Sequence, residues 1–278
     1  MRHSTVMFMM AALLVGVGSA LPAPAKAQNL VLAPTRVVLE GRTSKDRLLV
    51  SNPSDKATQY RVELVHRRML EDGTYETIKE PREDEKFADE LVRLSPRAFT
   101  LEPKSSQTVR IQLRKPKDLA EGEYRSHIQV QVIPDAPAVI PGDKPGQLGI
   151  QVQVNYGMSI PLIVRNGDVH YAITISDIEM APAAEDGKPH LKMAFNREGN
   201  SSVYGDIAVT FTTKNGKDYL LKFLPGLSVF TPNKRRTFDF PVELPEGLTE
   251  VKDGELKVTY RKQEDDGGTL IAEQSKAL

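Results

Sequence analysis

The chain has 278 residues, with 37 Lys and Arg balanced by 37 Asp and Glu, so its formal net charge is zero. This balance provides no overall field that would attract nucleic acid or an acidic surface. The chain contains no cysteine, which excludes disulfides, thiolate catalysis and thiolate metal sites.

Residues 1–27 are predicted to be a cleavable signal peptide. Arg2 and His3 precede an apolar run over residues 6–17, which is too short to span a membrane. Ala25-Lys26-Ala27 then has the small-x-small pattern of a secretory cleavage site. We therefore expect an exported protein with a mature chain that begins at Gln28.

Short runs of alternating apolar and polar residues dominate the first half after this segment. Such runs, separated by Gly, Pro and Asn turns, are typical of β-strands. The predicted strands are residues 31–32, 36–39, 47–50, 60–65, 97–101, 108–113 and 126–133. Asp72-Gly73 predicts a hairpin turn, and the charged residues 80–90 predict a solvated loop or a short helix.

Residues 150–165 form the longest alternating run in the chain. It follows a segment too rich in Pro and Gly for a helix or strand. Every second residue is apolar, so one face of an extended strand is an apolar stripe. The stripe comprises Ile150, Val152, Val154, Tyr156, Met158, Ile160, Leu162 and Val164.

Asn166-Gly167-Asp168 interrupts this pattern, and we place a domain hinge there. The second half repeats the strand-like character of the first. Its predicted strands are residues 171–178, 191–195, 206–212, 219–223, 236–240, 255–260 and 269–272. We therefore predict an all-β chain with two tandem sandwich domains, residues 28–165 and 166–278.

No pattern in the sequence indicates catalysis or a metal site. The histidines that remain after His3, at positions 66, 127, 170 and 190, are scattered without the spacing of metal ligands. No nucleophile elbow, phosphate-binding glycine loop or H-E-x-x-H occurs. We expect no enzyme activity, no cofactor and no metal, and we interpret His127 as a packing or surface residue.

The order of several segments resembles the PapD-like family of periplasmic pilus-assembly chaperones. The segments are P-T-R-V-V-L-E-G, L-L-V-S-N-P-S-D-K-A-T-Q-Y-R-V-E-L, L-S-P-R-A-F-T-L-E-P-K-S-S-Q-T-V-R-I, G-E-Y-R-S-H-I-Q-V-Q-V-I-P and I-P-L-I-V-R. In the second half, N-S-S-V-Y-G-D-I-A-V-T-F and F-T-P-N-K-R-R-T-F are similar but less distinctive. The resemblance implies two immunoglobulin-like sandwiches in an L shape.

The resemblance also implies a mechanism, donor-strand complementation. A pilus or spore-coat-like subunit lacks its last strand, and the chaperone lends its own strand before an outer-membrane usher receives the subunit. Carried onto this sequence, the donor side chains are Val152, Val154 and Tyr156, extended by Ile150 and Met158. By contrast, we expect Ile160, Leu162 and Val164 to pack inside their own sandwich. The resemblance leaves open whether the free protein dimerises.

Further roles follow from matching positions. Arg36 corresponds to the arginine that binds the subunit's terminal carboxylate in the cleft between domains. The family's second basic residue in that cleft is a lysine, whose place here is taken by Pro161. Arg165 corresponds to an arginine of an interdomain ion network, with Glu123 and Asp253 as its acidic partners.

Two other classes of function remain open from the sequence. An exported structural or adhesive protein would use the same sandwiches for surface attachment, and its stable incorporation into a fibre would distinguish it from a chaperone. A hydrolase or sugar-binding module would show saturable binding of a small ligand, which no motif in the sequence indicates.

Overall fold

The computed structural model describes residues 30–134, 156–182 and 187–278. Over these ranges the chain is all-β, and its one helical element is the single 3-10 turn Glu264–Asp266. Strands form because apolar residues recur at every second position, which places them on one face of an extended chain. No helix in these ranges is long and apolar enough to cross a membrane.

The first half folds into two sheets that share one core. One sheet has the order β1-β3-β9-β7 and the other has the order β2-β11-β10-β4-β8. The strands are β1 (Val31–Ala33), β2 (Val37–Leu39), β3 (Lys45–Ser51), β4 (Thr58–Val65), β7 (Val92–Ser95), β8 (Ala98–Leu101), β9 (Ser106–Leu113), β10 (Gly122–Ile133) and β11 (Gly157–Asn166). Side chains from both sheets, such as Val109 and Ile128, are fully buried between them.

The second half forms another sandwich with its own core. Its sheets have the orders β12-β13-β16 and β15-β14-β17-β18. The strands are β12 (Tyr171–Ala181), β13 (His190–Gly199), β14 (Val203–Thr213), β15 (Asp218–Val229), β16 (Arg235–Pro241), β17 (Gly254–Arg261) and β18 (Leu270–Ala277). Phe195 and Phe211, one from each sheet, are buried at its centre.

The predicted fold class is confirmed, and most predicted strands lie within observed ones, apart from an extra residue at one end of β2, β8 and β18. The run predicted over residues 150–165 corresponds to β11 only from Gly157, because residues 150–155 lie outside the described residues and Tyr156 precedes the strand. Strand β7 was not predicted because V-R-L-S is too short to show a period. The hairpin turn at Asp72-Gly73 is confirmed, since it joins β5 (Arg67–Met69) to β6 (Tyr75–Thr77). Residues 80–90 form a loop, but it is not fully solvated: Glu85 is buried in an ion pair with Arg68.

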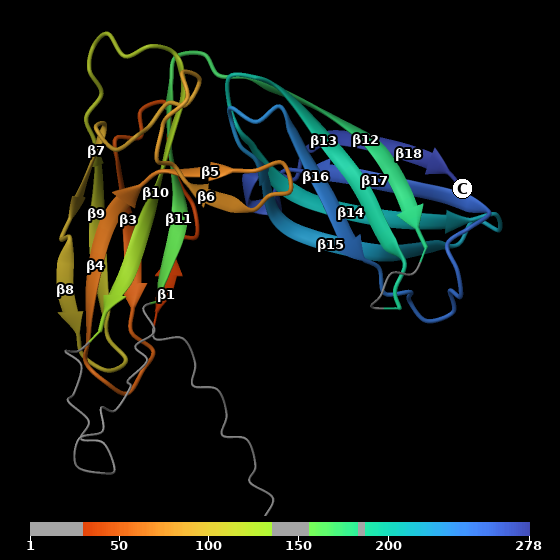
Figure 1. Ribbon diagram of the computed structural model, residues 1–278, viewed down its shortest axis with the longest axis horizontal. Coiled ribbons are helices and arrows are strands. Elements are labelled where there is room, and N and C mark those ends of the chain that lie inside the picture. Colours follow the sequence, from red (N-terminus) through yellow and green to blue (C-terminus); the bar gives the residue numbers. More distant parts are fainter. Residues whose placement is uncertain (1–29, 135–155, 183–186) are drawn as a thin grey trace, which may run out of the picture.

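The two sandwiches lie at a wide angle in an L shape, with the β5–β6 hairpin extending from the first toward the second (Figure 1). Three hydrogen bonds attach the hairpin to the second sandwich, one of them from the Thr237 hydroxyl to the Glu71 carbonyl at 3.2 Å. The Thr237 amide donates to the Glu71 carbonyl at 2.6 Å, and Asn233 Nδ2 donates to the Met69 carbonyl at 2.7 Å. Met69 also packs with Ile163 in a small apolar cluster, completed by Phe230 from the second sandwich.

Candidate functional site

Strand β11 has a long free edge among the described residues. β10 pairs with it along its whole length on one side. On the other side, β2 pairs only with the residues Leu162–Val164. The main-chain groups of residues 157–161 on that side therefore have no strand partner in the described part of the chain. Such an edge is a template on which another chain can add a strand.

The far half of the apolar stripe packs where the sequence predicts. Ile160, Leu162 and Val164 are buried in the core of the first sandwich. This confirms that these side chains serve their own domain. Their burial fixes the register of β11, because a shift of one residue would turn all three out of the core.

The near half of the stripe is only partly described. Tyr156 and Met158 are half-buried against the edge of the same core. Ile150, Val152 and Val154, the other three predicted donor residues, lie outside the described residues.

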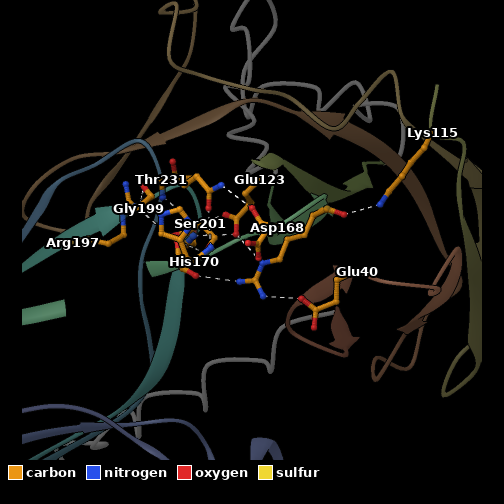
Figure 2. A network of polar contacts seen from close by, with 12 residues as sticks. Glu40, Lys115, Glu123, Asp168, His170, Arg197, Gly199, Ser201 and Thr231 are labelled. Carbon is orange, nitrogen blue, oxygen red and sulfur yellow. Dashed lines mark hydrogen bonds and ion pairs between the residues drawn. The ribbon is translucent and has the colours of Figure 1, made fainter. Parts of the chain in front are cut away.

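A network of polar contacts joins the two sandwiches beside the end of β11 (Figure 2). The side chain of Glu123 is fully buried and accepts hydrogen bonds from Arg165 Nε at 3.1 Å, the Ser202 amide at 3.0 Å and the Ser202 hydroxyl. Arg165 also pairs with Glu40 at 2.8 Å and donates to the Ser202 carbonyl at 3.1 Å. The Lys115 amine donates to the Arg165 carbonyl at 2.7 Å. The structure thus brings Glu123 and Arg165 together.

The charges in this network compensate one another. Burial by itself would lower the pKa of the Arg165 guanidinium, but the carboxylates of Glu123 and Glu40 outweigh it and raise that pKa. A buried ion pair adds little net stability, yet removing one partner is costly because the other charge stays buried. Ser202 belongs to the second sandwich. The hydrogen bonds of this network can therefore all form only when the two domains lie in this arrangement.

Arg197 supports the network from the second sandwich. It is almost fully buried and donates to several main-chain carbonyls, including those of Asn233 and Ser201, both at 2.9 Å. Burial lowers the pKa of its guanidinium. These bonds hold the turn that presents Ser202 to the first sandwich.

Asp253 is not part of this network, which corrects the assignment made from the sequence. It lies just before β17 and pairs with Lys214 at 2.8 Å on the surface. β17 runs antiparallel to β14, with Gly254 opposite Thr213. Asp253 is therefore at the end of β14 that is farthest from Ser202.

A cleft of about 480 Å³ opens between the sandwiches next to this network. Its lining residues come from both domains: Pro34, Thr35, Arg36, Val38, Glu40 and Arg165 from the first, and Tyr171, Ser202, Tyr204, Lys262, Gln263 and Asp266 from the second. Arg36 therefore lies in an interdomain cleft, where the resemblance places the arginine that binds a carboxylate.

The guanidinium of Arg36 has a hydrogen-bond donor that no described residue uses, so it can bind an anion. Its guanidinium carbon lies 4.3 Å from the centroid of the Tyr204 ring, and its Nε is buried without a hydrogen-bond partner. Burial lowers the pKa of Arg36, and the positive charge of Arg165 lowers it further. A carboxylate in the cleft would fill the free donor with a charge-assisted hydrogen bond and offset this repulsion.

Lys262 brings a second cation to the cleft from the other domain. It follows β17 and is exposed. Within the part of the chain that the structure describes, its amine forms no ion pair. Arg165, by contrast, is already bound to Glu123 and Glu40. Among the described residues, Arg36 and Lys262 are thus the cations of the cleft that form no ion pair.

Pro161 faces a different cavity. It lies opposite His127 in the β10–β11 pair. Together with Arg67, Tyr75, His127 and Ser159, it lines a cavity of about 220 Å³. The position that carries the family's lysine is therefore uncharged here, and any second cation must come from another element.

Sequence reasoning missed Ser202, Glu40 and Lys262. No local pattern marks them, because each acts only through residues distant in the chain. Arg197 did leave a signal: it shares the inward-facing parity of Phe195 in β13, where a charge requires buried partners.

The described residues contain no group of three or more His, Asp or Glu side chains that could hold a metal ion.

Residues 29–169 match the family profile "Pili and flagellar-assembly chaperone, PapD N-terminal domain". No curated protein matches the chain.

Several solved structures are similar to the chain at low identity. The E. coli chaperone DraB is 20% identical, covering 90% of this chain and 96% of its own, with a TM-score of 0.43. The Pseudomonas aeruginosa CupB2 chaperone is 12% identical, covering 89% and 100%, with a TM-score of 0.42. A chain of the Salmonella enterica SafA pilin in complex with the SafB chaperone is 16% identical, covering 91% and 98%, with a TM-score of 0.45.

The family match covers just over half of the sequence, and the chain belongs to the family of pili and flagellar-assembly chaperones. This confirms the resemblance drawn from the sequence and identifies the protein as an assembly chaperone.

Proposed function

We propose that this chaperone acts in the periplasm, binds pilus-type subunits by donor-strand complementation and delivers them to an outer-membrane usher. The observation that carries the proposal is the free edge of β11 over residues 157–161, next to a stripe of apolar side chains. Main-chain hydrogen bonds along such an edge supply affinity, and alternate side chains supply a temporary core for the partner.

The donated side chains on this proposal are Val152, Val154 and Tyr156, with Ile150 and Met158 as extensions. Burying a valine or larger apolar side chain contributes about 1.5–3 kcal/mol. Tyr156 and Met158 are already half-buried in their own domain, so they have less apolar surface to offer. The main contribution therefore falls to Val152 and Val154.

The subunit's terminal carboxylate binds Arg36 in the interdomain cleft. A guanidinium suits this role because its planar fork can hold both carboxylate oxygens. Lys262 supplies the second positive charge from across the cleft, in place of the lysine that Pro161 replaces. The bound carboxylate would then contact both domains at once.

The hydrogen bonds among Glu123, Arg165 and Ser202 fix the relative position of the two domains, so that both can contact the carboxylate. We place the domain boundary after Arg165, in the turn between β11 and β12, so that the network lies at the hinge. Asp253 has no part in it. The mature chain then consists of residues 28–165 and 166–278, following a signal peptide over residues 1–27.

The replacement Val154→Asp tests donor-strand binding. The carboxylate would enter an apolar groove of the subunit, and an unpaired buried charge costs several kcal/mol. We expect subunits to be lost from the tagged chaperone when it is purified from the periplasm and its bound proteins are identified by mass spectrometry.

Gln153→Asp is the matched control, because it adds the same charge one residue away on the opposite face of the strand. It should retain the bound subunit. If Val154→Asp also retained it, donor-strand complementation would be excluded. A chaperone that stays free of subunits even in its native sequence would instead favour an exported structural or adhesive protein.

The same free edge supports one further partner, a second copy of the chain. Without a subunit, two β11 edges can pair with each other. A dimer of the free chaperone that dissociates when a subunit binds, measured by light scattering, would support this arrangement.

A further inference from the structure

The outer face of the β4–β10–β11 sheet carries a second site that the proposed function does not use. It consists of two adjoining cavities of about 320 and 220 Å³, which share Arg67 and Ser159. We call the pair the β11 groove. The cavities lie on the face that the β5–β6 hairpin crosses (Figure 1), since Arg67 and Tyr75 of that hairpin form part of their wall.

The groove extends down to the main chain of β11, because the side chains on the outer face of this part of the strand are small. Gly157 lies opposite Gln131, and Ser159 lies opposite Gln129. A side chain at Gly157 is excluded by the backbone itself, since a Cβ there would lie 2.7 Å from the Val130 carbonyl oxygen. No bulky side chain on this part of β11 separates its free edge from the groove.

Four buried polar atoms of residues that line the groove have no hydrogen-bond partner in the described part of the chain: Arg67 Nε, His127 Nδ1, Tyr156 Oη and Ser159 Oγ. His127 is only 3% exposed, and its ring is edge-on to Tyr75 at 5.6 Å between centroids. Burial, reinforced by the positive charges of Arg125 and Arg67, lowers the pKa of His127 to about 3, so the ring is neutral. Buried polar groups are rarely left unpaired, so these atoms offer hydrogen bonds to a polar group that enters the groove.

The charge of the groove indicates what that ligand is. Arg61 and Arg67 line it, and among the residues that the structure describes no Asp or Glu side chain lines either cavity. Arg67 Nη2 is held over the floor by a 2.7 Å hydrogen bond to Gln129 Oε1. The unpaired Nε of Arg67 and the positive charge of the exposed Arg61 favour an anion in the groove, and a carboxylate fits the planar fork of a guanidinium.

The position of the groove indicates where the carboxylate comes from. A strand added at the free edge of β11 points every second side chain toward the outer face of the sheet. Neighbouring strands are about 4.8 Å apart, and a glutamate side chain can extend over Gly157 and Ser159 toward Arg67. We propose that the β11 groove binds an Asp or Glu side chain on the outward face of the subunit strand that pairs with β11. The identity of this partner rests on the proposed function.

An NMR titration of the free chaperone tests the site without a subunit. The probe is the blocked peptide acetyl-Thr-Glu-Thr-Glu-Thr-amide, and its control is the same peptide with Gln for Glu. We expect the glutamate peptide to shift the His127 ring and Gln129 side-chain signals and to bind at least ~10-fold more tightly than the control, as a charge-assisted hydrogen bond predicts. Equal binding of the two peptides, or shifts confined to other surfaces, would overturn the proposal.

Arg67→Gln should abolish the preference for glutamate. The matched control is Arg47→Gln, which removes the same charge from an exposed residue of β3 in the other sheet. Because Arg67 also takes part in the hairpin, Ser159→Leu gives a second, uncharged way to fill the groove, and it should weaken binding of the glutamate peptide similarly. If both variants fold and keep the preference, the site is wrongly assigned. Because this assay involves no subunit, its failure is distinct from retained subunit binding by Val154→Asp, which would contradict donor-strand complementation itself.

Discussion

Two polar regions lie side by side at the domain boundary, and they differ in how completely their charges are paired. In the ion network, Glu123 and Arg165 are both saturated by hydrogen bonds. In the neighbouring cleft, Arg36 has a buried donor without a partner, and Lys262 forms no ion pair among the described residues. A network whose hydrogen bonds are all formed holds the two domains in one arrangement. Two cations without ion-pair partners, by contrast, can bind a ligand.

This difference predicts that the two regions respond to mutation in opposite ways. Substitutions in the network should change stability and the relation of the domains. Substitutions in the cleft should change subunit affinity while leaving stability almost unaltered. The following experiments test that separation.

The largest effect is expected for Glu123→Ala. It leaves the Arg165 charge and the Ser202 amide buried without their main acceptor, and breaking a buried ion pair in this way typically costs about 3–5 kcal/mol. Urea unfolding should show this loss in the free energy of unfolding, together with a change in domain arrangement measurable by small-angle scattering.

Asp253→Asn is the control for that experiment, because asparagine removes the charge and tolerates the positive φ of 54° at this position. Asp253 forms an exposed pair with Lys214, and exposed pairs contribute little. Its unfolding midpoint should match that of the native chain. Equal destabilisation by the two substitutions would mean that the buried network is not what holds the domains together.

Arg36→Ala should have its main effect on binding. It removes the planar fork that holds the subunit's carboxylate, and loss of a charge-assisted hydrogen bond corresponds to about 10-fold or more in affinity. The free energy of unfolding should stay the same or rise slightly, because the guanidinium is buried at a cost. Titration calorimetry with the captured subunit measures the affinity, and urea unfolding measures the free energy of unfolding.

Arg36→Lys separates geometry from charge. It keeps the positive charge but loses the two-pronged hydrogen bonding, so the affinity should be intermediate. If Arg36→Ala bound the subunit as tightly as the native chain, the cleft would not be the carboxylate site. If Arg36→Ala instead strongly lowered the free energy of unfolding, Arg36 would belong to the Glu123–Arg165 ion network.

The sequence predicted the architecture well because sandwich strands carry local signals. Alternation along β4, β9 and β10 is visible in the residues themselves, and burial of Ile160, Leu162 and Val164 follows from it. Strand β7 escaped detection, since four residues show too few periods to identify a strand.

The site was harder to predict because it is assembled from distant segments. Arg36 and Glu123 were found through the family resemblance, but Ser202 and Lys262 reach the boundary only through the folded second domain. The replacement of the family's lysine by Pro161 was visible in the sequence. The residue that compensates for it was not, because Lys262 is about a hundred positions away.

The smallest effect is expected for Lys262→Gln. Lys262 is exposed, so its attraction for a carboxylate is weakened by solvent and amounts to about 0.2–1 kcal/mol, or a roughly 1.5- to 5-fold loss of subunit affinity. The loss should shrink as the salt concentration rises, because exposed charges are screened.

A subunit whose terminal carboxylate is amidated sharpens this test. If Lys262 acts on that carboxylate, the amidated subunit should bind the native chain and Lys262→Gln equally well. An undiminished effect of Lys262→Gln on the amidated subunit would show that the lysine acts on another group. Lys276→Gln, which removes a charge from β18 outside the cleft, controls for the change in net charge. Only a loss of subunit affinity that depends on both Lys262 and the carboxylate would show that the carboxylate site includes residues of both domains.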